Sequence, residues 1–540
     1  MKKLLKWFDL NILTVFSFFL IVFIPLYPKL PLFEAIPGYI VRVRLEDILL
    51  LLGFLIFIIQ VIRKKATLKS VIFWPIVIYI VIGFLSSLSA IFITKTVPTD
   101  KIHVVKLFLH WFRRIEYFSI FFIFYNGIRN KMDARKITIL SLVTVLFVSL
   151  YGYGQKYLYW PVYSTMNREF SKGIKLYLTE HARVPSTFGG HYDLAAYLVV
   201  FLTLFISLFL VLKRKNIIKW VSLVVFLFGY WLLILTASRT SYIAYLGAVT
   251  VLILILSFKK ESLKKGIVWG LSRWFSLIIF SLFIMTMFGD LSDRFAHILG
   301  MPKIRDKLNL DYLTRPLKPN PPNAIQLTDD IALVMDRTDE RPTIDRPDSG
   351  SGGDLPPDVY EDIPDGYEES TESATLSGAI NRIPKKRTFS DNAYQFGLST
   401  AIRLDALWPR AIAGFKRNPL LGSGYSTLTK EAVSIFTEAE STDNDYLRTL
   451  GETGALGFIS FFAVIFIVLK TIFKNLKKTI DPISFSLFVA FIAFTFGLLI
   501  NALYIDVFEA SKVAFMFWAL TGVVLAVIEK NKGKKAYEKK

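Results

Sequence analysis

The segment that decides the fold ends a long polar insert, and it reads Arg403-Leu-Asp-Ala-Leu-Trp408, then Asn418-Pro-Leu-Leu-Gly-Ser-Gly-Tyr425-Ser-Thr, then Asp443-Asn-Asp-Tyr-Leu-Arg-Thr-Leu-Gly-Glu452-Thr-Gly-Ala-Leu-Gly457. Long apolar stretches lie on both sides of this insert. A charged, glycine-rich segment between membrane spans has to lie at a water interface. We therefore expect the chemistry of this protein to take place there.

Composition indicates the class of the rest of the chain. Its 540 residues are 53% hydrophobic and include 48 Phe, with a mean hydropathy of +0.47. A soluble core of this size cannot hold so much apolar surface. Stretches approaching the 20 or so apolar residues that cross a bilayer predict an all-α, polytopic membrane protein with about twelve spans. They occupy residues 10–26, 45–62, 71–93, 115–128 with the upstream flank, 137–158, 192–212, 217–235, 242–258, 267–288, 455–469, 483–503 and 513–528.

The basic residues of the short loops predict the orientation. Clusters such as Arg63-Lys-Lys, Lys213-Arg-Lys and Lys259-Lys alternate with loops that lack them. Under the positive-inside rule, both termini lie in the cytoplasm. The net charge of +21 then reflects topology and attraction to anionic membrane lipids, not nucleic-acid binding.

The spans divide the chain into four parts. Residues 1–289 hold nine spans and an outer loop at 159–190, residues 290–451 form a large extracytoplasmic loop, residues 452–529 hold three spans, and residues 530–540 are a basic cytoplasmic tail. Within the large loop, residues 315–386 are too acidic and too poor in apolar side chains to offset the entropy of ordering. We expect this stretch to be a disordered spacer, with a receptor-like role as the alternative. Residues 401–417 have the spacing of an amphipathic helix, which we place on the outer membrane surface.

Several arginines fall on the predicted outer side, where basic residues are comparatively unexpected, and three of them lie in loop motifs. Arg239 lies in a short turn between two spans, and Arg183 and Arg403 lie in the two long outer loops. An arginine beside hydrocarbon needs an anionic partner or snorkels to lipid headgroups, and both interpretations remain open. Because a guanidinium donates two parallel hydrogen bonds to phosphate oxygens, the three could bind one phosphate group. The five His are scattered and Cys is absent, so we expect no metal and no cofactor.

The order of these motifs resembles the O-antigen ligase and O-antigen polymerase family of polyprenyl-diphosphate-dependent membrane glycosyltransferases. The resemblance covers about residues 183–461, and earlier spans match only in hydropathy. The matching segments are Ser186-Thr-Phe-Gly-Gly-His-Tyr-Asp-Leu-Ala-Ala-Tyr197, the turn Thr236-Ala-Ser-Arg239, the Asn418-Pro-Leu-Leu-Gly-Ser-Gly stretch, Asp443-Asn-Asp-Tyr-Leu, and Glu452-Thr-Gly-Ala-Leu-Gly457.

This resemblance implies transfer of a glycan from a polyprenyl-diphosphate-linked donor to a hydroxyl of a glycan or lipid-glycan acceptor, at the outer face and without a metal. Arg239 and Arg403 would hold the diphosphate. The sequence departs from the family at two points. Asp443 stands where the ligases have His, and Arg403 precedes Trp408 by five positions where many relatives have four, which leaves Arg410 as a substitute.

The residues themselves suggest how such a transfer proceeds. Arginines stabilise the negative charge that grows on a departing diphosphate, and a base activates the acceptor hydroxyl, so that a single displacement inverts the anomeric centre. Candidate bases are Asp443, His191, Asp193 and Asp445. The catalytic set is therefore Arg239, Arg403 and Asp443, and the substrate-binding set is Arg183, His191, Asp193, Arg410, Asn444, Tyr446 and Glu452.

Several of these residues have structural alternatives. Asp443 and Asn444 precede a predicted helix and could cap it, His191 could cap the sixth span, and Glu452 could pair with Arg448 four residues earlier. The turn at Gly422 either lets the backbone pass close to a bulky group, cradles a phosphate, or is a plain turn.

The function predicted from the sequence is a surface-polysaccharide polymerase or an O-antigen ligase, with polymerase favoured because Asp replaces His. Protein O-oligosaccharyltransferase and a transporter or flippase of lipid-linked glycans are the alternatives. The lack of a visible internal repeat favours the enzyme over a transporter.

Overall fold

A computed structural model describes residues 2–35, 42–166, 170–178, 182–287, 367–369, 382–384, 398–428, 442–479 and 481–537. All twelve predicted spans are helices, and eleven of the described helices are long and apolar enough to cross a membrane. The protein is thus built as a multi-pass, predominantly helical membrane protein. The twelve helices are α1 (Lys2–Leu26), α2 (Leu45–Ile62), α3 (Phe73–Phe92), α4 (Lys101–Gly127), α5 (Lys131–Leu158), α6 (His191–Val211), α7 (Ile217–Leu235), α8 (Arg239–Ser257), α9 (Leu263–Met287), α16 (Asp445–Leu476), α17 (Pro482–Asn501) and α18 (Ser511–Tyr537).

The helix outside the eleven is α4, because its first half is charged. It begins fourteen residues before the predicted apolar stretch, and Arg113 and Arg114 lie in its middle. Arg113 forms ion pairs with Asp47 of α2 (2.6 Å) and with Glu116 (2.6 Å). Pairing with other helices therefore buries a helix that hydropathy alone does not recognise as a span.

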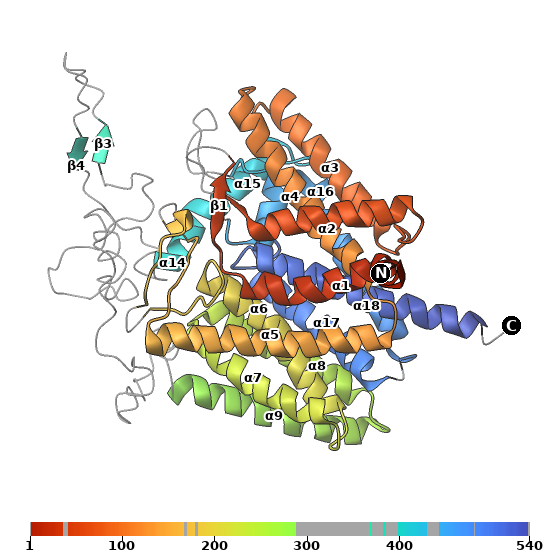
Figure 1. Cartoon of the computed structure of the whole chain (residues 1–540). Coiled ribbons are helices and arrows are strands. Elements are labelled where there is room, and N and C mark those ends of the chain that lie inside the picture. Colours follow the sequence, from red (N-terminus) through yellow and green to blue (C-terminus); the bar gives the residue numbers. More distant parts are fainter. Residues whose placement is uncertain are drawn as a thin grey trace, which may run out of the picture.

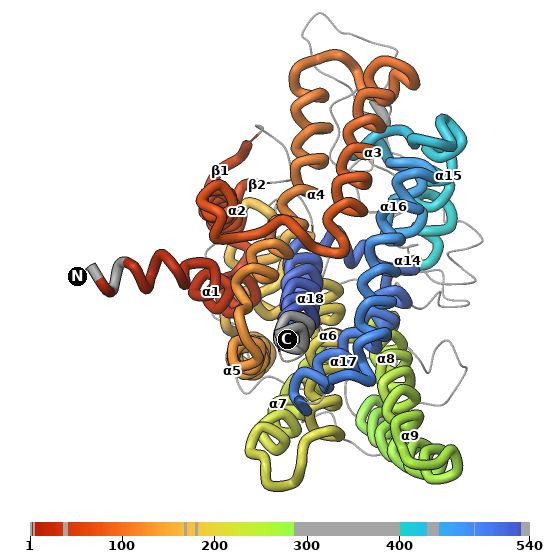
Figure 2. Tube along the Cα trace, turned by 90° about the vertical axis from the view of Figure 1, so that its right-hand side faces the viewer, coloured from red at the N-terminus to blue at the C-terminus, as the bar shows by residue number. Residues whose placement is uncertain are grey.

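The centre of the bundle is formed by α6, α17 and α18, as Figure 2 shows for α17 and α18. The apolar part of α18 is completely buried by other helices. Small residues allow this close packing. A Cβ on Gly522 of α18 would lie 2.6 Å from the carbonyl oxygen of Phe121 in α4, and one on Gly497 of α17 would lie 3.0 Å from that of Ala244 in α8.

Both termini lie at one end of the bundle (Figure 1). At the other end are the antiparallel hairpin of β1 (Pro31–Glu34) and β2 (Arg42–Arg44) and the short helix α14 (Leu398–Ala401). We call this the β1 end. The predicted topology places this end on the outer side.

The end of the insert is helical but not one regular helix. After α14, the chain forms a π-helix (η3, Ile402–Leu407) and then α15 (Trp408–Arg417). The buried face of α15 consists of Ala411 and Gly414, which pack against α16. The predicted amphipathic helix therefore exists, with an interruption at the π-helix.

Most of the acidic stretch 315–386 lies outside the described residues. Two short strands within it, β3 (Tyr367–Glu369) and β4 (Arg382–Pro384), pair in antiparallel orientation. The composition of this stretch had not predicted any strand.

Candidate functional site

The connection between α17 and α18, residues 502–510, joins several parts of the β1 end. The carbonyl oxygen of Leu503 accepts a hydrogen bond from Asn444 Nδ2 (3.0 Å), and that of Tyr504 accepts one from Arg403 Nη2 (3.3 Å). One turn earlier, Ser241 Oγ of α8 donates to Asn501 Oδ1 (3.1 Å). The α17–α18 connection therefore brings the start of α8, the π-helix and the start of α16 together.

Arg403 is buried and forms an ion pair with Asp443, at 2.8 Å between Nη2 and Oδ2. Its guanidinium lies 4.6 Å from the centre of the Tyr504 ring, and the Trp408 ring packs edge-on against the same tyrosine at 5.9 Å. The N–H of Trp408 donates to the carbonyl oxygen of Arg403, which is the i to i+5 pattern of a π-helix. The wider turn places two residues five apart on one face, so the extra residue between Arg403 and Trp408 does not separate them.

Asp443 has a left-handed backbone with φ of 50°, which is uncommon for a residue other than glycine. The carboxylate of Asp506 accepts hydrogen bonds from the N–H groups on both sides of it, Thr442 (3.0 Å) and Asn444 (2.8 Å). This clamp fixes the turn. The Asp443 side chain, 31% exposed, points at Arg403.

The residues after Asp443 have mainly structural contacts. Asn444 is the N-cap of α16, and its Oδ1 accepts from the N–H of Leu447 (2.9 Å), so the capping interpretation applies to Asn444 and not to Asp443. The Tyr446 hydroxyl donates to the carbonyl oxygen of Leu499 (2.8 Å). Asp445 is buried and accepts from the N–H of Phe508 (3.2 Å). Substrate binding by Asn444 and Tyr446 stays a prediction.

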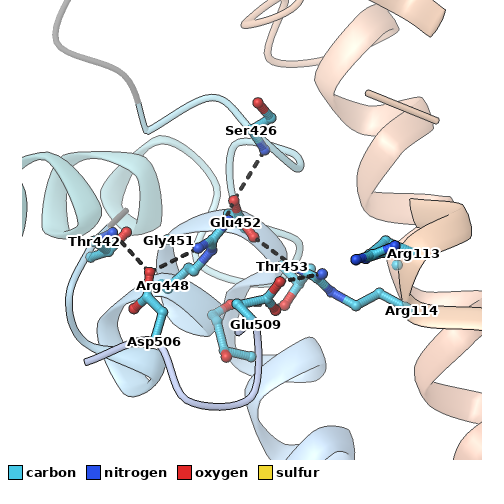
Figure 3. A network of polar contacts seen from close by, with 12 residues as sticks. Arg113, Arg114, Ser426, Thr442, Arg448, Gly451, Glu452, Thr453, Asp506 and Glu509 are labelled. Atoms are coloured by element: carbon cyan, nitrogen blue, oxygen red, sulfur yellow. Dashed lines mark hydrogen bonds and ion pairs between the residues drawn. The ribbon is translucent and has the colours of Figure 1, made fainter. Parts of the chain in front are cut away.

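Glu452 belongs to a buried charge network (Figure 3). Its carboxylate pairs with Arg448 one turn earlier (3.4 Å) and with Arg114 of α4 (3.6 Å), and it accepts from the N–H of Ser426 (3.0 Å). The predicted pairing of Glu452 with Arg448 is confirmed. This carboxylate already has three partners. Substrate binding by Glu452 remains a prediction.

The same network extends to the α17–α18 connection. Arg114 pairs with Glu509, and Arg448 pairs with Asp506 at 2.8 Å (Figure 3). Burial raises the pKa of Glu509 above its ordinary value. Removing one partner of such a buried pair typically costs about 3–5 kcal/mol. The network therefore fixes α4 and α16 to the connection that carries the candidate site.

The Asn418-Pro-Leu-Leu-Gly-Ser-Gly stretch crosses α16 at a break in that helix. Gly454 has φ of 66° and interrupts the helix, and residues 419–424 supply the hydrogen bonds that the helix loses there. A Cβ on Gly454 would lie 2.4 Å from the carbonyl carbon of Leu420, and one on Gly422 would lie 2.5 Å from that of Glu452. The bulky group beside the Gly422 turn is thus the α16 backbone. The bonds are Ala455 N to Pro419 O (2.8 Å), Leu456 N to Leu420 O (3.2 Å), Ser423 N to Gly451 O (2.9 Å) and Gly424 N to Glu452 O (2.9 Å).

Arg183 and His191 are in contact. Arg183 Nη1 lies 2.8 Å from His191 Nε2 and donates to the Tyr192 hydroxyl (3.2 Å). Because a guanidinium only donates, Nε2 accepts and the neutral imidazole carries its proton on Nδ1. While this contact persists, His191 Nε2 cannot take the proton from the hydroxyl of an acceptor glycan. The N–H of Val184 donates to the carbonyl oxygen of Leu235 (3.2 Å), which ties the loop to the end of α7.

Arg239 is the first residue of α8, directly after the N-cap Ser238. It is half-buried, and the described residues offer its guanidinium neither a hydrogen bond nor an ion pair. The bonds from Val184 to Leu235 and from Ser241 to Asn501 place Arg239 at the same end of the bundle as Arg183 and Arg403. The three predicted arginines therefore share the β1 end, and Arg239 has the most freedom to bind an anion.

Asp193 and Arg410 complete the predicted set. Asp193 is half-buried in the first turn of α6, within electrostatic range of Lys29 and Lys512. Arg410 lies half-buried in α15, whereas the ion pair with Asp443 is made by Arg403.

A buried cluster beside Asp193 was not predicted. Lys29 pairs with Glu46 at the start of α2 (3.2 Å), and burial lowers the pKa of Lys29. Lys512 Nζ donates to the carbonyl oxygens of Tyr27 (2.6 Å) and Thr187 (2.8 Å). The sequence motifs did not predict Asp506 and Glu509 either. Charged residues at the ends of apolar spans were the signal that could have found them.

In the described part of the chain, no group of three or more His, Cys, Asp or Glu could hold a metal ion. Comparison of the sequence with protein-family models and with curated proteins finds no match.

Proposed function

We propose that this protein is a membrane glycosyltransferase that moves a glycan from a polyprenyl diphosphate to an acceptor hydroxyl, as a surface-polysaccharide polymerase or an O-antigen ligase. The observation that carries the proposal is the half-buried guanidinium of Arg239, which has no ion pair among the described residues and lies at the same end of the bundle as the Arg403–Asp443 pair. Such a cation at a membrane-helix terminus suits an anionic ligand.

The arginines would act on the leaving group. As the bond between the anomeric carbon and the diphosphate oxygen breaks, the electron pair leaves with the diphosphate and its negative charge grows. Arg239 and Arg403 would stabilise this charge more in the transition state than in the bound donor. Arg183, held by His191 and Tyr192, is a third cation for the same group.

Asp443 would serve as the base. In the absence of donor its carboxylate is neutralised by Arg403. A diphosphate that takes over the Arg403 guanidinium would release the Asp443 carboxylate, which then accepts the proton of the acceptor hydroxyl as the new bond to the anomeric carbon forms. Donor binding and activation of the base would thus be coupled, and the product would have inverted stereochemistry.

The proposed location follows from the basic loops. Positive loops at the end of the bundle that holds both termini support a cytoplasmic orientation of that end, and the β1 end would face outward in the cytoplasmic membrane. The donor and the acceptor would meet there, and the surrounding lipids are the remaining partners. A protein acceptor, as in an O-oligosaccharyltransferase, would use the same groups.

The test is turnover by the purified full-length protein. Incubation with a lipid-diphosphate oligosaccharide and an acceptor should release free lipid diphosphate. Arg239→Ala should abolish the release, whereas Arg214→Ala should not, because Arg214 is an exposed arginine in the loop between α6 and α7, at the opposite end of the bundle.

Two outcomes would contradict the proposal. If Arg239→Ala released lipid diphosphate as wild-type protein does, Arg239 would have no role in the reaction. Movement of intact donor across vesicle membranes by wild-type protein, with no lipid diphosphate released, would favour a transporter or flippase.

A further inference from the structure

A cavity of about 320 Å³ lies between α8 and α9, away from the candidate site. Its walls are almost entirely apolar, and several of its large side chains face outward, among them Leu254, Ile267 and Leu271. This volume is at the small end of the range for ligand pockets, about 300–1,000 Å³. The cavity therefore suits a narrow, flexible apolar group.

The shape of the cavity comes from how the two helices cross. At the loop between them, Gly266 and Gly270 pack on Ser257, and a Cβ at either position would lie within 2.5 Å of a Ser257 oxygen. Farther along, Trp274 Nε1 donates to Thr250 Oγ1 (2.9 Å) and closes the other end of the cavity. Between these two contacts the helices separate and leave an open side.

Cations surround the loop end of the cavity. Lys259, Lys260, Lys264 and Lys265 are exposed there, and one of them, Lys265, is neutralised by Glu261 (2.9 Å). Lys260 lies with its Nζ 4.3 Å from the centre of the Trp269 ring, beside Gly266 of the cavity wall. An apolar space with uncompensated positive charge at one end matches a molecule that has an apolar chain and an anionic head.

The cavity is far from Arg239. Helix α8 runs from Arg239 to Ser257, 19 residues, which is about 28 Å. This is close to the thickness of a bilayer core, about 30 Å. A ligand of the cavity therefore lies in the leaflet opposite the one at the β1 end.

We propose that the cavity between α8 and α9 binds an acyl chain of an anionic phospholipid from this leaflet, with the head group held by Lys260 and Lys264. The lipid would fill the space between the glycine crossing and the Trp274 hydrogen bond. The site is separate from the proposed glycosyl transfer, and its test does not depend on that activity.

The experiment is native mass spectrometry of purified full-length protein with two lipids that have identical chains, phosphatidylglycerol and phosphatidylcholine. Because one lysine near an anionic surface contributes about 1 kcal/mol, which is roughly fivefold in affinity, the protein should retain phosphatidylglycerol at least fivefold better. The double variant Lys260→Gln, Lys264→Gln should lose this preference and still bind phosphatidylcholine.

The apolar part of the site is tested by filling it. Ile267→Trp and, on the other helix, Leu254→Trp should lower retention of both lipids. Ile279→Trp is the matched control, since Ile279 is equally exposed on α9 and lies outside the cavity.

Three outcomes would overturn the proposal: equal retention of the two lipids by wild-type protein, unchanged retention by both filled variants, or displacement of phosphatidylglycerol by a polyprenyl diphosphate, which would make the donor the occupant.

Discussion

The N–H of Trp408 donates a hydrogen bond to the carbonyl oxygen of Arg403, five residues earlier, and both side chains contact the ring of Tyr504. In a regular α-helix, residues four apart share a face. In the π-helix, residues five apart share a face in the same way. Arg403 and Trp408 thus share a face although they are five residues apart.

A deletion tests this equivalence. Removing the exposed Asp405 should turn the π-helix into an α-helix with Arg403 and Trp408 still on one face, so that transfer activity falls by less than about tenfold. Removing Ala413 from α15 should cause a larger loss, because it rotates Gly414 by about 100° away from α16. If the Asp405 deletion is as inactive as Arg403→Ala, then the π-helix itself is required.

Asp443→Asn should slow the transfer and leave the fold intact. Asparagine tolerates the left-handed backbone, but it cannot accept a proton, and loss of a general base typically costs about 10²–10⁴ in rate. Donor binding should be maintained or improved, since Arg403 loses its internal anion. The measurements are kcat and KM with purified protein. A normal kcat would exclude Asp443 as the base.

Asp506→Asn should destabilise the protein, because the carboxylate accepts from two backbone N–H groups and pairs with Arg448. Loss of one partner of a buried ion pair corresponds to about 3–5 kcal/mol. The control is Asp481→Asn, because Asp481 is the N-cap of α17 and asparagine caps a helix about as well as aspartate. Thermal unfolding in detergent should show a clearly larger drop for Asp506→Asn, and equal drops would refute the clamp.

Gly454→Ala should also destabilise the protein. The substitution combines strain of about 1–3 kcal/mol, from a backbone conformation (φ 66°, ψ −169°) that is almost confined to glycine, with a collision against the Leu420 carbonyl. Gly247→Ala is the comparison, because the added methyl there meets only the flexible end of Ile500. A small effect at Gly454 would mean that the break in α16 can move.

The stability of the protein should depend on pH through Glu509. Burial raises the pKa of Glu509 above its ordinary value of 4.5, so between pH 4.5 and the folded-state pKa the folded protein binds more protons than the unfolded chain. Stability from this group is therefore lost as pH rises through the folded-state pKa. Glu509→Gln should flatten the decline in melting temperature above pH 4.5, whereas the exposed Glu261→Gln should leave it unchanged. A slope identical to wild type would contradict the raised pKa.

Local sequence patterns predicted most of the helices. Apolar length alone located eleven spans, and the i to i+4 spacing predicted the Arg448–Glu452 pair. Hydropathy placed the fourth span at residues 115–128, whereas α4 begins at Lys101, since Arg113 and Arg114 are stabilised by carboxylates distant in sequence. Likewise, α16 begins ten residues before the predicted tenth span because Asn444 and residues 502–508 hold its polar first turns.

The candidate site was predicted only where its residues lie in recognisable motifs. Arg239, Arg403 and Asp443 were proposed from such motifs, and the structure pairs Asp443 with Arg403. The partners that position them, Asp506 above all, lie more than 50 residues away along the chain. Nothing in one sequence shows which distant carboxylate closes a turn, because that choice depends on how the helices pack.

The break at Gly454 has a mechanical meaning. Although α16 is one continuous stretch of chain, its hydrogen-bond ladder passes at the break into residues 419–424 and back again. A displacement of the Asp443 turn would therefore be transmitted sideways into this crossing segment before it reached the membrane-embedded length of the helix. The turn that holds Asp443 and the membrane-embedded length of α16 would be separated at a single glycine.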